Sequence, residues 1–189
     1  MATINFTQTD SAATIGTPSC SGRGFGFGSD TRAATDGGTP GSTPISISLA
    51  SSASLIDRGP SKCTVVVGAL WTSGTWTWRL NITTANMNLT LEEVYICRFN
   101  SSDVSQATIG SSTALAISLG TTGVKSGTIS GSAQSPSVGD YVSVMFTFSN
   151  SAMSAQSFSF TPNQNIDSPF TTPTGTNLLQ FCISPQPTR

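Results

Sequence analysis

Histidine is absent from this chain of 189 residues, and charged residues make up only 9% of it. The absence of histidine excludes the Ser-His-Asp and Cys-His arrangements that activate a nucleophile. Between Val104 and Thr188 the only charged residues are Lys125, Asp140 and Asp167. The chain has no basic patch that could neutralise phosphates, so binding to nucleic acid is not expected.

Cysteine is scarce and widely spaced. The four cysteines are Cys20, Cys63, Cys97 and Cys182, too far apart for a CxxC pair, so a zinc site is not expected. We interpret Cys63, Cys97 and Cys182 as small, buried hydrophobic residues on strands. Cys63 and Cys97 could be neighbours in a sheet, but their spacing determines neither the pairing nor the redox state.

The chain also lacks a long apolar segment and a secretory signal. Its longest apolar run, VVVGALW at residues 65–71, is far shorter than the roughly 20 residues that cross a bilayer. The amino terminus has no positively charged start followed by an apolar run. We therefore expect a product of the cytoplasm with no membrane anchor.

Motifs that hold metals or cofactors are missing as well. No Asp-x-Asp cluster suggests calcium, and no glycine-rich loop is followed by Lys-Ser/Thr to hold a phosphate. GRGFGFG at residues 22–28 resembles a nucleotide loop only superficially, because it lacks a strand-loop-helix context. We expect no catalytic residue, no metal and no cofactor, and we expect that the protein is not an enzyme.

A pair of carboxylates can in principle cleave a glycosidic bond. Glu92 and Glu93 are adjacent, so on a regular strand they point to opposite faces and cannot flank one glycosidic bond unless a bulge turns them together. We expect them at a solvated edge or in a salt bridge with Arg79 or Arg98.

Serine and threonine are abundant: together they number 59 of the 189 residues. Hydrophobic residues make up 37% and the formal net charge is −1, which favours a packed fold over disorder. The surface of such a fold must be covered mainly by hydroxyl and amide groups. A weak net charge gives a free monomer little colloidal protection, which favours a place inside an assembly.

The pattern changes at residue 45. Residues 1–44 carry glycine and proline without sustained periodicity, and we predict an extended arm there. Residues 45–189 show period-two alternation between turn residues. They predict one antiparallel β-sandwich domain, jelly-roll or Ig-like, of about eight or nine strands. The expected strands are ISISL (45–49), CTVVVGAL (63–70), TWTWRLNIT (75–83), LTLEEVYICRF (89–99), TALAISL (113–119), GTISG (127–131), YVSVMFTFS (141–149), QSFSFTP (156–162) and NLLQFCIS (177–184). The adjacent Glu92 and Glu93 mark a candidate bulge.

All three tryptophans lie within residues 71–78. A sugar-binding platform needs rings on a polar face, whereas here the polar residues alternate onto the opposite face. Trp71, beside a turn, is the ring that could be exposed to a glycan. The residues predicted for the core are Trp76, Trp78, Leu80 and Ile82 in one row and Val142, Val144, Phe146 and Phe148 in a second row.

The arm contains a candidate contact. Arg23, Phe25 and Phe27 alternate with glycine, and arginine and aromatic residues carry much of the energy of protein interfaces. They could insert into pockets of another subunit, or they could fold back as a lid over the end of their own sandwich.

Four stretches together resemble the small β-rich structural proteins of tailed-bacteriophage virions. They are WTWRLNITTAN (76–86), VYICRFNSS (94–102), the segment from IGSSTALAISL to FTFSN (109–150) and TPNQNIDSPF (161–170). The resemblance implies a head decoration or cement protein, typically a trimer that caps junctions between major capsid subunits. No set of functional residues carries over.

We therefore expect a non-enzymatic structural protein on the capsid surface of a virion, made in the host cytoplasm. It would bind assembled major capsid protein and other virion subunits, as a homo-oligomer with a trimer favoured, and would stabilise the phage head. The alternative is a host-recognition or carbohydrate-binding β-sandwich module of a tail or fibre, with Trp71 at the glycan contact.

Overall fold

The computed structural model describes residues 3–6, 19–20, 23–24, 32–36, 45–52, 56–58, 61–64, 72–102, 104–137, 139–161 and 170–171. Every regular element in these ranges is a β-strand. No helix that could span a membrane occurs in the same ranges. The predicted all-β class is therefore confirmed.

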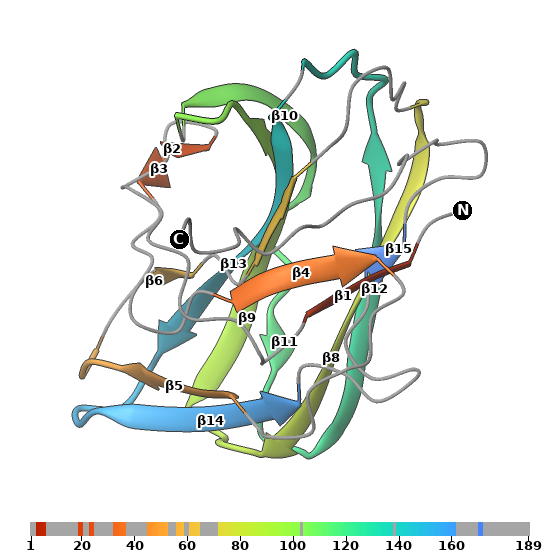
Figure 1. The fold of residues 1–189 in the computed structure, drawn as a ribbon. Helices are drawn as coiled ribbons and strands as arrows, with labels where there is room; N and C mark the ends of the chain where they lie inside the picture. Colours follow the sequence, from red (N-terminus) through yellow and green to blue (C-terminus); the bar gives the residue numbers. More distant parts are fainter. Residues whose placement is uncertain are drawn as a thin grey trace, which may run out of the picture.

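Eight strands form two antiparallel layers of four strands each, which pack face to face (Figure 1). In spatial order, layer one contains β12 (Gly123–Gly131), β8 (Gly74–Thr84), β14 (Gln156–Thr161) and β5 (Ile45–Leu49). Layer two contains β10 (Ser105–Ser112), β9 (Leu89–Phe99), β13 (Tyr141–Asn150) and β6 (Ile56–Arg58). This order confirms the predicted sandwich, which the sequence pattern alone could not arrange in space.

A bridge of four short strands connects the two layers between β13 and β8. Its members in order are β7 (Ser61–Thr64), β4 (Arg32–Asp36), β1 (Thr3–Phe6) and β15 (Phe170–Thr171). The remaining short strands are β11 (Ile117–Ser118), which pairs with β9, and the hairpin of β2 (Ser19–Cys20) and β3 (Arg23–Gly24). The predicted arm, residues 1–44, thus supplies β1 to β4, and two of these join the main sheet. The division of the chain at residue 44 stays a prediction.

The core lies between the two layers. All eight side chains predicted for it, from Trp76 to Ile82 and from Val142 to Phe148, are buried. The indole of Trp78 meets the ring of Phe146 edge-on, with 6.3 Å between ring centroids, and Phe148 packs against Phe158 on β14 at 5.0 Å. Such aromatic pairs stabilise the core beyond the area that they bury.

Two glycines of β12 make room for the indoles. Gly127 lies opposite Trp78 in the ladder, and a Cβ atom at Gly127 would lie 2.7 Å from Cζ2 of that ring. A Cβ at Gly131 would likewise collide with the Trp76 indole. The glycines of GTISG therefore allow close approach of the strand backbone to the two largest core residues.

The predicted bulge in β9 is confirmed. Thr147 of β13 lies opposite Glu93 whereas the next residue, Phe148, lies opposite Leu91, so Glu92 is the additional residue. The insertion shifts the alternation by one position. Leu91 before the bulge and Val94 after it therefore both face the core.

One strand prediction was wrong in extent, and one strand was not predicted. Residues 113–119 were expected to form one strand, but only Ile117–Ser118 does so. Ala114 and Ala116 have φ angles of 56° and 48°, in the left-handed region that interrupts a strand. The sequence pattern missed β10, because Ile109 is its single large apolar residue.

Of two other expected strands, the structure describes one in part and the other not at all. The predicted strand 63–70 overlaps β7 at residues 63–64, while 65–71 and 177–184 lie outside the described residues.

Replacing Trp78 with alanine should lower the free energy of unfolding by about 3–5 kcal/mol, because a buried indole leaves a large cavity. Thr77→Ala is the matched control on the outer face of the same strand, and its effect should be below about 1 kcal/mol. Urea denaturation followed by circular dichroism measures both. Equal midpoints for the two variants would show that Trp78 is not a core residue.

Candidate functional site

The outer face of layer one is covered by hydroxyl groups. Strand alternation places the core residues inward, so the intervening serines and threonines face solvent. They are Ser46 and Ser48 of β5, Ser157 and Ser159 of β14, Thr75, Thr77 and Thr83 of β8, and Ser126, Thr128 and Ser130 of β12. Asn81 and Val124 complete the face, and Arg79 is its one charged side chain among the described residues.

This hydroxyl face offers hydrogen-bond donors and acceptors with almost no charge. Ser159 Oγ donates to Ser46 Oγ at 3.3 Å, which links β14 to the edge strand β5. Hydroxyl groups can both donate and accept hydrogen bonds. The face is therefore suited to neutral polar contacts with water or with another polar surface.

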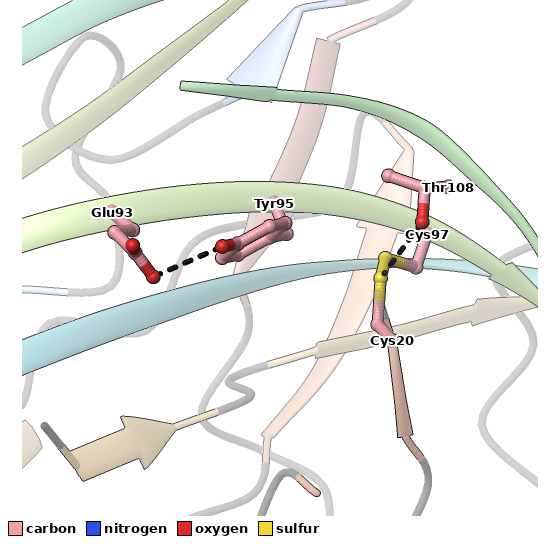
Figure 2. Close-up of a disulfide and its surroundings, with 5 residues drawn as sticks. All are labelled: Cys20, Glu93, Tyr95, Cys97 and Thr108. Carbon is pink, nitrogen blue, oxygen red and sulfur yellow. Dashed lines mark hydrogen bonds between the residues drawn. A yellow bond between two sulfur atoms is a disulfide. The ribbon is translucent and has the colours of Figure 1, made fainter. Parts of the chain in front are cut away.

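The outer face of layer two carries a second, smaller core that contains a disulfide. Cys20 of β2 is bonded to Cys97 of β9, with 6.3 Å between their Cα atoms, and both residues are fully buried. They pack with Tyr95, Phe99 and Met145. Figure 2 shows the disulfide beside Tyr95, with the Thr108 hydroxyl 3.6 Å from Cys20 Sγ. The bond therefore ties the amino-terminal β2–β3 hairpin to the sandwich.

The interpretation of Cys97 as a small, buried residue on a strand is confirmed, and the structure adds its bond to Cys20. Cys63 is not its neighbour. The backbone of Cys63 pairs with Val142 on one side of β13, and Cys97 pairs with Ser143 on the other side. Cys182 lies outside the described residues. Sequence reasoning gave Cys20 no role because it lies in the aperiodic arm.

The bulge brings the two adjacent glutamates to the same face. Ser149 Oγ donates to Glu92 Oε1 at 2.5 Å. The Tyr95 hydroxyl donates to Glu93 Oε2 at 3.0 Å, as Figure 2 shows. Both donors project from the outer side of layer two. The bulge therefore places the two carboxylates on one face of the sheet, as two groups that flank a glycosidic bond would have to be. Each carboxylate already accepts a hydrogen bond from its own sheet.

Arg79 and Arg98, the two arginines expected to pair with these glutamates, have other positions or partners in the structure. Arg79 lies on the outer face of the other layer, and Arg98 pairs with Asp140, with 3.8 Å between Nε and Oδ2. Arg98 Nη1 also donates to the Ser135 carbonyl at 2.7 Å, and the Ser137 amide donates to Asp140 Oδ2 at 2.9 Å. The pair therefore fixes the loop between β12 and β13.

The structure describes only the backbone of one of the predicted arm contacts. The backbone of Arg23 lies in β3, directly opposite Cys20 in the hairpin. The Arg23 side chain, Phe25, Phe27 and Trp71 lie outside the described residues. No group of three or more acidic, cysteine or histidine side chains within the described ranges is arranged to hold a metal ion.

No protein-family model matches the chain, and none of the curated proteins matches it significantly. Among solved structures, a CocE/NonD family hydrolase from Staphylococcus aureus is similar over 86% of this chain, with 8% identity and a TM-score of 0.46. A structure of the infectious bursal disease virus Gx strain is similar over 93% of this chain, with 10% identity and a TM-score of 0.32.

The chain spans 36% of the hydrolase and 56% of the viral chain. Likenesses at these identities and TM-scores do not bear on function.

Removing the disulfide should lower the free energy of unfolding by about 4 kcal/mol, because the bond closes a long loop in the unfolded chain. Cys20→Ser and Cys97→Ser should each show this loss, and adding a reductant should reproduce it in the unchanged protein. Peptide mapping without reduction should recover a peptide that joins Cys20 to Cys97. A pairing with Cys63 or Cys182 instead would contradict the assignment.

Proposed function

We propose that this chain is a non-enzymatic structural protein of a virion, a decoration or cement protein that binds the assembled major capsid protein and stabilises the head. The observation that carries the proposal is the hydroxyl face, in which a single charged side chain, Arg79, accompanies rows of serine and threonine. Such a surface gives a free protein little electrostatic protection against association. It suits a subunit that works within an assembly.

The disulfide is consistent with a position on the outer surface of a virion. Cys20 and Cys97 form a buried cross-link, and disulfides persist in oxidising surroundings, which include the surfaces of virions. A subunit on the outside of a released particle would keep the bond and the stability that it adds. Attachment of a homo-oligomer, with a trimer favoured, at many equivalent positions would turn modest contacts into strong avidity.

Purified particles from the source virus should contain the chain, and the recombinant protein should cosediment with expanded, empty shells from the same particles. Binding should saturate at a fixed ratio to the major capsid protein. The same preparation is applied to a glycan array as the comparison. Absence from particles and failure to cosediment would contradict the proposal, and array binding that Trp71→Ala abolishes would favour a tail or fibre module.

The proposed arm contact is tested by the triple variant Arg23→Ala, Phe25→Ala, Phe27→Ala. Its melting temperature should equal that of the unchanged protein, while its affinity for shells should fall by at least about tenfold, as expected when interface anchors are truncated. A lower melting temperature with full binding would instead assign these residues to a lid over their own sandwich.

A further inference from the structure

Two methionines project from adjacent turns at one end of the sandwich. Met87 lies in the turn between β8 and β9 and is 82% exposed, and Met153 lies in the connection from β13 to β14 and is 94% exposed. These are the two most exposed large hydrophobic residues among those the structure describes. In Figure 1 both turns lie at the lower end of the sandwich.

An asparagine side chain fixes the turn around Met87. Asn86 Oδ1 accepts from the Asn88 amide at 3.0 Å, so the residues on both sides of the methionine are joined. Asn86 Nδ2 also donates to Gln156 Oε1 at 2.7 Å and to the Ser157 carbonyl at 3.2 Å. The backbone that carries Met87 is thereby tied to β14.

A second asparagine holds Met153 in a similar way. Asn150 is 3% exposed, and its Oδ1 accepts from the Ala152 amide at 2.9 Å while its Nδ2 donates to the Ser154 carbonyl at 3.1 Å. The residues on both sides of Met153 are thus bonded to one side chain. Asn150 Nδ2 also donates to the Ala50 carbonyl at 2.7 Å, which ties this turn to the end of β5.

The two turns are also bonded to each other. The Ser151 amide donates to the Asn88 carbonyl at 3.0 Å, and Ser151 Oγ donates to the same oxygen at 3.2 Å. The relative position of the two methionine-bearing backbones is therefore set before any partner binds. Such preorganisation lowers the entropy cost of association.

The turns at this end of the sandwich contain no charged residue of their own, although the Lys125 ammonium donates from β12 to Thr121 Oγ1 at 2.7 Å. Residues 50–52, 85–88, 119–122 and 151–155 contain no aspartate, glutamate, lysine or arginine, and no aromatic ring. Anionic membranes are recognised by lysine and arginine, with tryptophan or phenylalanine at the boundary. The chemistry of this end therefore favours a protein surface with shallow apolar pockets over a lipid surface.

We propose that Met87 and Met153 are the anchors through which the chain docks on the capsid protein lattice, each filling an apolar pocket. This inference rests on the proposed function and names its contact surface. The methionine side chain is flexible and polarisable, so it can fit pockets of different shapes without a change in the backbone of its turn. Because both anchors are uncharged and Lys125 is a single cation beside them, docking should change little between low and high salt.

The first test uses the unchanged protein and hydrogen peroxide, which oxidises exposed methionine to the sulfoxide. In the free protein Met87 and Met153 should oxidise rapidly, while the fully buried Met145 serves as the internal control. Bound to empty shells, both exposed methionines should be protected, as read by mass spectrometry of peptides. Equal oxidation of Met87 and Met153 in the free and bound protein would overturn the inference.

The second test compares variants in cosedimentation with the same shells. The double variant Met87→Gln, Met153→Gln should bind at least about tenfold more weakly, since two apolar anchors are lost. Met87→Leu with Met153→Leu should keep most of the affinity. The matched control is Val104→Thr, which changes a 54% exposed residue beyond the opposite end of β9 and should bind like the unchanged protein.

The outcomes separate the two proposals. If the unchanged protein binds shells and the double glutamine variant binds equally well, the docking surface is wrong and the structural role stands. If the unchanged protein does not bind shells, both are wrong. Protection of the methionines in concentrated free protein that sediments as an oligomer would assign this end to self-association. Binding of the unchanged protein, but not of the glutamine variant, to phosphatidylcholine vesicles would assign it to lipid; either result overturns the inference.

Discussion

The burial of two indole rings between the layers is the interaction on which the rest of the structure depends. Trp76 and Trp78 have almost no exposed surface, and the glycines at positions 127 and 131 let β12 lie directly against them. Burying side chains of this size supplies much of the hydrophobic stabilisation that a domain with so few charged residues requires. It also fixes which face of each strand points outward, and so creates the hydroxyl face.

Period-two alternation was enough to predict the class of fold, both core rows and the bulge at Glu92, because each depends on the residues of one strand. The pattern failed where tertiary contacts or unusual backbone angles determine whether a strand forms or which cysteines pair. Ser105–Ser112 forms a strand although it contains one large apolar residue, and its partner β9 supplies the hydrogen bonds. The bond between Cys20 and Cys97 joins residues 77 positions apart, and Cys20 lies in a segment with no periodicity.

The candidate contact surface was still harder to predict. Met87 and Met153 have no sequence signal of their own, since an isolated methionine in a polar turn is ordinary. What distinguishes them is that Asn86 and Asn150 hold their turns, and that Ser151 joins the two turns. These bonds connect segments that are brought together only when the sandwich is complete. The predicted anchors in the arm and Trp71, by contrast, were chosen by residue type alone.

The molecule combines rigid connections with a nearly uncharged surface. The disulfide, the Arg98–Asp140 pair and the asparagine side chains fix the hairpin and loops at several places on the sandwich. A rigid, neutral subunit gains little from long-range attraction, so its attachment must come from complementary shape repeated over many equivalent sites. The proposed role on a capsid lattice supplies such repetition.

Docking on the capsid lattice through Met87 and Met153 is tested most directly by a cryo-electron microscopy reconstruction of empty shells saturated with the protein. The docking surface proposed above predicts a density that fits the two-layered sandwich standing on the lattice, with the turns that carry Met87 and Met153 at the contact and the hydroxyl face turned away from the lattice. A sandwich lying on its hydroxyl face with both methionines in solvent, or shells without added density, would contradict it.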